Sequence, residues 1–144
     1  MFFEELNIGD KFNTRPRVVT GTEIDNFAVS TGLINPLFLD DKAARSRGFE
    51  TRIAPGYLTL SLTVGAVYAL GLLDHGLALL SITVNFTAPV QAGDEIRSTV
   101  EVVEKNETQN RGRGIVAFKI ICQNQEGKQV FEVPKLVTLL LRSS

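Results

Sequence analysis

The chain has 144 residues, the length of one ordinary domain, and such a chain buries about two thirds of the surface its unfolded form exposes. Its 15 basic and 16 acidic residues nearly cancel, leaving a formal charge of -1. No overall field therefore attracts nucleic acid or an anionic membrane surface, and we expect neither as a partner. We expect a single domain over residues 1–144.

The start of the chain and its single cysteine are typical of a cytoplasmic protein. Met1–Glu5 is not a basic segment followed by a long apolar stretch, so no signal peptide is predicted. Cys122 cannot form an internal disulfide, and its apolar neighbours predict a buried strand with an inert thiol. Tyr57–Leu73 carries no charge, but its interspersed Thr, Ser and Gly residues favour a buried helix over a membrane span.

The first part of the chain predicts a short strand followed by a capped helix. Lys11–Val19 has the pattern of a strand, which Pro16 confines to an edge or a bulge. Thr20 and Glu23 have the spacing of a capping box, in which both side chains satisfy free backbone donors at a helix start. The helix should end before Gly32, which is a suitable C-terminal cap.

A long irregular connection then leads to a very apolar helix. The connection, Leu33–Pro55, contains one predicted helical turn over Asp40–Ser46, and connections of this length usually have a function. The helix is predicted from Gly56 to about Gly71. Because it is apolar around most of its circumference, we expect other structure to wrap it.

The second half predicts antiparallel strands. Ile82, Val84 and Phe86 alternate with polar residues, as in a strand half buried on a sheet. Three further strands are predicted over Ile96–Val103, Gly114–Cys122 and Lys128–Leu141. Pro134 predicts a bulge or an edge in the last strand. Together with the apolar helix this gives an α+β architecture whose open sheet edge invites a second copy, so we expect a dimer.

Three segments carry a family resemblance: Thr31–Asp40 (TGLINPLFLD), Arg52–Tyr57 (RIAPGY) and Val84–Asp94 (VNFTAPVQAGD). In this order and spacing they resemble the MaoC-like family, which includes R-specific enoyl-CoA hydratases and the dehydratases of fatty-acid synthesis. The resemblance covers nearly the whole chain. It implies a hot-dog fold, an antiparallel sheet wrapped around a long central helix, and an acyl chain attached as a thioester to CoA or to a carrier protein.

The chain departs from the family's catalytic pattern at both reactive positions. That pattern, Gly-Asp-x-Asn-Pro-Leu-His, supplies the aspartate and histidine that hold and activate the water added to an enoyl thioester. Leu33 stands at the aspartate position and Phe38 at the histidine position, and neither side chain exchanges a proton. These two residues either line a pocket for the acyl group or fill the vacated space as core, and no catalytic residue is assigned.

Four further residues complete the substrate-binding site that the resemblance implies. Gly56 starts the central helix, where free N–H groups and the positive end of the helix dipole suit a thioester carbonyl; alternatively, this glycine only permits a close turn. Asn35 is expected mainly to shape the loop by bonding nearby backbone. Tyr57 and Ser61 could supply a hydroxyl, although burial with a backbone partner is the commoner role for both.

Histidine and arginine side chains add little to the predicted chemistry. His75, the only histidine, matches no family catalytic position and is predicted to be an exposed turn residue. His75 and the single cysteine are distant from each other in the sequence and form no metal-ligand cluster. No metal site is therefore predicted, and we expect no cofactor. Arg45, Arg47 and Arg52 make the connection locally basic, which suits the phosphates of CoA, but surface solvation explains them equally well.

Three functions remain open at this point. The first is an acyl-thioester binding domain with altered chemistry or none. The second is a non-catalytic partner that holds the acyl chain while a related hot-dog subunit supplies Asp and His. The third is an acyl-CoA thioesterase, for which Glu50 or Asp40 would have to reach in from the connection, because the central helix has no acidic residue.

Overall fold

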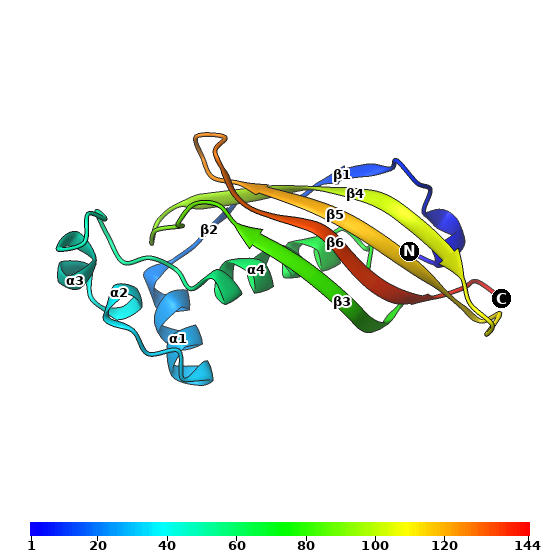
Figure 1. Cartoon of the computed structure of the whole chain (residues 1–144), viewed down its shortest axis with the longest axis horizontal. Helices are drawn as coiled ribbons and strands as arrows, with labels where there is room; N and C mark the ends of the chain where they lie inside the picture. The colour runs from blue at the N-terminus through cyan, green and yellow to red at the C-terminus, as the bar shows by residue number, and fades with distance from the viewer.

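The computed structural model describes all 144 residues and consists of an antiparallel sheet laid over one long helix (Figure 1). The strands lie in the order β1 (Lys11–Asn13), β4 (Glu95–Glu107), β5 (Arg113–Gln123), β6 (Gln129–Leu141) and β3 (Gly76–Phe86), and β2 (Arg17–Val18) also pairs with β4. Helix α4 (Gly56–Ala69) runs along one face of this sheet. This is the α+β, hot-dog arrangement that the sequence predicts.

Three short helices lie beside the N-terminal end of α4 and form an overhang at one end of the molecule (Figure 1). They are α1 (Gly21–Thr31), α2 (Pro36–Leu39) and α3 (Asp41–Arg45). Helix α3 confirms the predicted helical turn, whereas α2 was not predicted. A single 3-10 turn, η1 (Phe3–Glu5), lies at the opposite end of the sheet.

Helix α1 begins and ends where the sequence indicates. The Thr20 hydroxyl accepts a hydrogen bond from the Glu23 N–H at 3.1 Å, and the Glu23 carboxylate accepts one from the Thr20 N–H at 3.2 Å. Partial burial would raise the pKa of Glu23, but hydrogen bonds from Arg17 and Thr20 outweigh it and lower that pKa. Gly32 ends the helix in the left-handed conformation, with φ of 78°.

The strands differ from the prediction mainly at their ends. β3 begins at Gly76, well before the alternating residues, and β4 continues to Glu107. The predicted first strand is instead divided into β1 and β2 around Pro16, because proline cannot donate to the ladder. In β6 the register against β3 and β5 shifts next to Pro134, which confirms the predicted bulge.

The core lies between α4 and the sheet. Val67 of α4 and Phe118 of β5 are at most 2% exposed, and Cys122 is completely buried as predicted. Burial raises the pKa of the Cys122 thiol, and hydrogen bonds with Ser98 and Thr63 only partly offset this effect. The thiol is therefore protonated and shielded from substrates.

Helix α4 is open along one side, so the prediction that other structure wraps it is wrong in part. Its exposed residues are Tyr57, Ser61, Gly65, Tyr68 and Ala69. The sheet ends at β3, which has β6 as its only strand neighbour, and nothing beyond β3 covers this side of the helix. The chain contains no helix with both the length and the hydropathy needed to cross a membrane.

The capping box of α1 can be tested by substitution. Thr20→Ala removes the side-chain acceptor for the Glu23 N–H, and we expect the free energy of unfolding to fall by about 1 kcal/mol. Equilibrium urea unfolding measures this difference. Thr22→Ala, at an exposed position whose hydroxyl makes no hydrogen bond, is the control, and an equal loss in both variants would contradict the capping role.

Candidate functional site

Two segments that are distant in sequence pair immediately before α4. The Ala54 N–H donates to the Val90 carbonyl at 2.7 Å, and the Ala92 N–H donates to the Arg52 carbonyl at 2.8 Å. These bonds join two of the three segments that carry the family resemblance. They fix the chain on both sides of the cavity that opens next to Gly56.

The remaining segment, Thr31–Asp40, is attached to the stretch before α4 through α2 and Arg52. The Ile53 N–H donates to the Leu37 carbonyl at 3.0 Å, and the Arg52 N–H donates to Asp41 Oδ1 at 2.9 Å. The Arg52 guanidinium also pairs with Asp25 of α1, and its side chain is only 15% exposed. Arg52 therefore holds the overhang helices together, and its charge is neutralised there.

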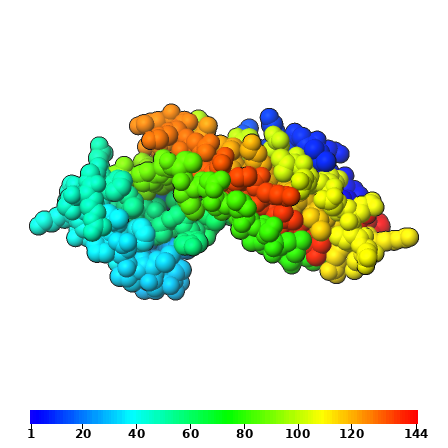
Figure 2. Space-filling view, in the orientation of Figure 1, coloured from blue at the N-terminus to red at the C-terminus, as the bar shows by residue number.

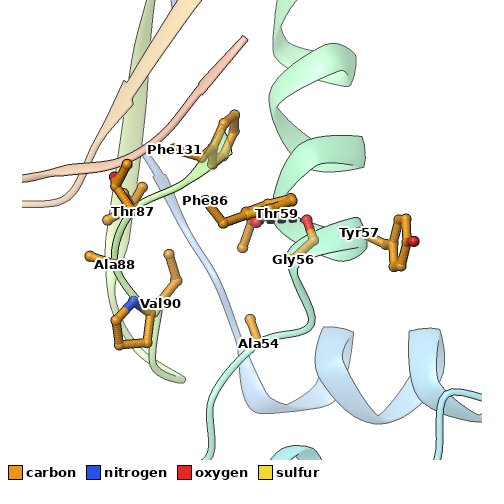
Figure 3. A pocket seen from close by; sticks show the side chains of 11 residues that line it. Ala54, Gly56, Tyr57, Thr59, Phe86, Thr87, Ala88, Val90 and Phe131 are labelled. Carbon is orange, nitrogen blue, oxygen red and sulfur yellow. Dashed lines mark hydrogen bonds between the residues drawn. The ribbon is translucent and has the colours of Figure 1, made fainter. Parts of the chain in front are cut away.

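A cavity of about 550 Å³ lies at the N-terminal end of α4 (Figure 3). The ring of Phe86, at the end of β3, forms the wall next to Gly56, whereas Tyr57 points away from the strands. A Cβ atom on Gly56 would lie 2.8 Å from Phe86 Cε1, closer than van der Waals contact. Only glycine allows the ring to pack against the first residue of the helix. The lining residues are Ala54, Gly56, Tyr57, Thr59, Phe86, Thr87, Ala88, Pro89, Val90, Val130 and Phe131.

The first two amides of α4 have no acceptor within the chain. The N–H groups of Leu58 and Thr59 bond to the Pro55 carbonyl at 3.0 and 3.3 Å, but those of Gly56 and Tyr57 make no hydrogen bond. Unpaired donors at a helix N-terminus carry partial positive charge. They can therefore stabilise a thioester carbonyl or the negative charge that develops on it.

A second cavity, of about 570 Å³, lies further along α4 between this helix and β3. Its lining residues are Leu60, Ser61, Val64, Tyr68, Leu73, Gly76, Leu77, Ala78, Leu79, Ile82, Leu136 and Thr138. Both cavities lie along α4 and β3, and we refer to the two of them together as the α4–β3 groove. No Asp, Glu, His, Lys, Arg or Cys lines either cavity, so the groove contains no ionisable acid or base other than tyrosine.

Three of the six predicted substrate-binding residues lie in this groove. Gly56 and Tyr57 line the first cavity and Ser61 lines the second. The Ser61 hydroxyl donates to the Tyr57 carbonyl at 2.8 Å, and Tyr57 is 66% exposed. The expectation of burial is wrong for both side chains, because their face of α4 is uncovered.

The other three predicted residues lie in the overhang and line neither cavity. Asn35 caps α2, with its side-chain oxygen accepting from the Leu37 N–H at 3.0 Å, as expected for a turn residue. Leu33 and Phe38 are half buried, and Phe38 packs against the hydrophobic core. Phe86 was missed as a site residue, although the aromatic residue before the link to Pro89 was part of the recognised segment.

The remaining candidates lie away from the groove. His75 is half buried rather than exposed, because the Phe2 ring stacks on it with centroids 3.8 Å apart. The Asp40 carboxylate caps α3 by accepting from the Lys42 N–H at 2.9 Å. Glu50 is exposed and lines neither cavity. Neither carboxylate is positioned beside the free amides of α4.

Comparison with known proteins identifies the family. The MaoC like domain matches residues 4–123. The chain belongs to the MaoC-like domain family. A 3-hydroxybutyryl-CoA dehydratase from Methylorubrum extorquens is 34% identical over 113 residues, which are 78% of this chain and 71% of that protein. An (R)-specific enoyl-CoA hydratase from Rhodospirillum rubrum is 28% identical over 137 residues, 92% of either chain.

A solved structure is similar to this chain over its whole length. The crystal structure of a monoamine oxidase regulatory protein from Archaeoglobus superposes with a TM-score of 0.89 at 34% identity, covering 100% of this chain and 96% of that one. The MaoC-like family contains hydratases and dehydratases that act on thioesters of CoA or acyl carrier protein.

The contact between Gly56 and Phe86 predicts the effect of a small substitution. In Gly56→Ala the added methyl group meets the Phe86 ring, and we expect overpacking to lower the free energy of unfolding by about 1–3 kcal/mol. Urea unfolding measures the change. Gly65→Ala, whose Cβ would meet no atom within 4 Å, is the control and should not destabilise the helix. In a Phe86→Ala background Gly56→Ala should cost much less stability, and an equal cost in both backgrounds would contradict the proposed contact.

Proposed function

We propose that this MaoC-like protein binds acyl thioesters without hydrating enoyl thioesters by the usual Asp and His chemistry of its family. One observation carries the proposal. The α4–β3 groove combines two free amides at the start of α4 with a lining that contains no carboxylate, imidazole, amine or thiol. Such a groove has donors for a carbonyl but no general base for water.

The groove matches the two parts of an acyl thioester. The carbonyl oxygen binds the Gly56 and Tyr57 amides, which are free and lie at the positive end of α4. The acyl chain extends along the mainly apolar lining toward the second cavity. Gly56 and Val64 are roughly 12 Å apart along the helix axis at about 1.5 Å per residue, which leaves room for a chain of several carbons.

Hydration needs groups that these positions do not supply. Addition of water to an enoyl thioester requires one group to take a proton from water and one to deliver a proton to the carbon next to the carbonyl. Leu33 and Phe38 stand at the two family positions for these groups and have no exchangeable proton. Cys122 is buried in the core with a raised pKa, so it provides no substitute.

Binding and chemistry are separated by one set of measurements on the purified protein. Isothermal titration with butyryl-CoA should show saturable binding, while crotonyl-CoA should show neither loss of enoyl absorbance nor release of thiol. CoA alone is the control for binding through the nucleotide. Hydration of crotonyl-CoA would contradict the proposal. Thiol release would instead favour the thioesterase function, with Asp40 or Glu50 as the carboxylate to replace next.

A gain-of-function variant tests the assignment of the two positions. We expect the double substitution Leu33→Asp and Phe38→His to introduce hydration of crotonyl-CoA at least tenfold above the unmodified protein, because a positioned acid and base contribute about 10²–10⁴ in rate. Either substitution alone should leave the rate at background. A folded double variant with no hydration would show that these positions are not the missing acid and base.

The second candidate is the non-catalytic subunit of a heteromeric dehydratase. The uncovered side of α4 favours it, since a related subunit with intact Asp and His would find an open apolar surface there. Co-purification with such a relative, and hydration only by the mixture, would support this function.

Cys122 is an unpaired, fully buried thiol, which suits a reducing compartment, and on that ground we propose a cytoplasmic location.

A further inference from the structure

A polar cavity lies at the opposite edge of the sheet from the α4–β3 groove. Its volume is about 370 Å³, and its lining residues come from β1 and the link after it, from β4 and from the end of β5. None of them is hydrophobic except the ring of Pro16. The sheet has β1 and β4 at one edge and β3 at the other, and the space-filling view shows the N-terminal segment beside β4 at the margin away from β3 (Figure 2).

The cavity lies where the edge of the sheet is interrupted. β1 ends at Asn13 and β2 begins at Arg17, and both strands pair with β4. Between them the Thr14 N–H donates to the Ser98 carbonyl at 2.9 Å, and the Thr14 hydroxyl accepts from the Ser98 N–H at 2.8 Å. A side-chain oxygen thus replaces a backbone carbonyl in the ladder, and Pro16 has no N–H to pair. The backbone at the base of the cavity is therefore fully hydrogen-bonded.

Four side chains of the cavity lie on the face of the sheet that points away from the core. Residues of β4 alternate between exposed and buried over Glu95–Val100, and Arg97 and Thr99 are among the exposed ones. In the ladders Gln123 is opposite Arg97, and Asn13 is opposite Thr99. Residues directly opposite each other share a face of the sheet, so these four side chains surround the same space.

These side chains present hydrogen-bond donors that have no partner within the chain. The Arg97 guanidinium belongs to none of the ion pairs and makes no hydrogen bond. The Asn13 side-chain oxygen accepts from the Thr99 hydroxyl at 3.2 Å, which leaves the amide N–H groups of Asn13 free. The Gln123 amide, at the end of β5, also has no partner. The cavity therefore offers mainly donors.

The positive charge at the cavity is not neutralised. Arg15 and Arg97 both line a small adjoining cavity, and neither forms an ion pair, whereas Arg17 is paired with Glu23. Glu95 lies two residues before Arg97 on the same face, but it makes no ion pair with Arg97 and lines neither cavity. Two guanidinium groups without a nearby carboxylate attract an anion to this place.

We propose that this cavity binds the oxyanion group of a small polar ligand, a phosphate monoester or a carboxylate, between Arg97, Asn13 and Gln123. The planar fork of a guanidinium matches two oxygens of either group. The two amides supply further donors to the same oxygens. A volume of about 370 Å³ is within the range of small-molecule sites, and the polar lining suits a hydrated ligand rather than an acyl chain. The site is separate from the α4–β3 groove and does not depend on the proposed function.

Nuclear magnetic resonance locates the binding. The protein is titrated with inorganic phosphate and, separately, with malonate, each at constant ionic strength. The side-chain N–H signals of Arg97, Asn13 and Gln123 should shift in a saturable way with at least one of these anions, at millimolar concentration or below. Tighter binding of phosphate would assign a phosphorylated ligand, and tighter binding of malonate a carboxylated one. Absence of saturable shifts with both anions would overturn the proposal.

Matched variants separate a built site from general surface charge. Asn13→Asp keeps the shape of the side chain and its acceptor for Thr99, but it replaces the free donors by a negative charge, so we expect affinity to fall at least about tenfold. Arg97→Lys keeps the charge and loses the fork, which should also weaken binding. Arg113→Ala, at an exposed arginine of β5 without an ion pair, should bind as the unmodified protein does.

Equal affinity in all three variants would overturn the proposal, because it would show that the anions respond only to the general charge of the surface. The spectra of the free variants report whether each is folded, and neither measurement involves acyl-CoA.

Discussion

The backbone pairing of Ala54 with Val90, and of Arg52 with Ala92, is the constraint on which the site depends. It fixes the point at which the chain enters α4 and brings the link after β3 beside that point. The residue before the helix is Pro55, whose side chain offers no acceptor for the first amides. The start of α4 is therefore held in place from outside the helix, and its own donors stay available.

This way of starting a helix contrasts with α1 in the same chain. There Thr20 and Glu23 satisfy each other's backbone donors, so the helix end is complete and offers nothing to a ligand. The stability of α4 comes instead from packing, as with Val67, which is 2% exposed in the core. The chain thus uses local hydrogen bonds where a helix is structural and tertiary contacts where an end must remain free.

Much of the fold could be predicted because its signals are local. The capping residues of α1, the turn at Gly32 and the apolar run of α4 are each readable from a few neighbouring residues. The beginning of β3 could not be predicted in this way, because bulges at Leu77 and Leu80 break the alternation of apolar and polar residues that identifies a strand. The open side of α4 could not be predicted either. The sequence of an apolar helix indicates that its side chains favour burial, but it does not indicate whether the covering residues belong to the same chain.

The site was predictable as a region but not as a set of contacts. Gly56 was recognised from its place at the helix start, while its contact with Phe86 depends on residues that only the fold brings together. Leu33 and Phe38 were recognised as departures from a catalytic pattern, yet neither lines the groove within one chain. The sequence of such a domain therefore predicts its fold and the region of its site more safely than it predicts the reaction.

The same contact constrains how such a sequence can change over time. As long as an aromatic ring occupies position 86, alanine at position 56 brings its Cβ to 2.8 Å from that ring and lowers stability, whereas the ring can be exchanged for a smaller side chain without crowding the glycine. The less costly order of substitution is therefore a smaller strand residue first and a larger helix residue second. Among descendants of this chain, a larger residue at the helix start should be found mainly together with a smaller one at the end of the strand.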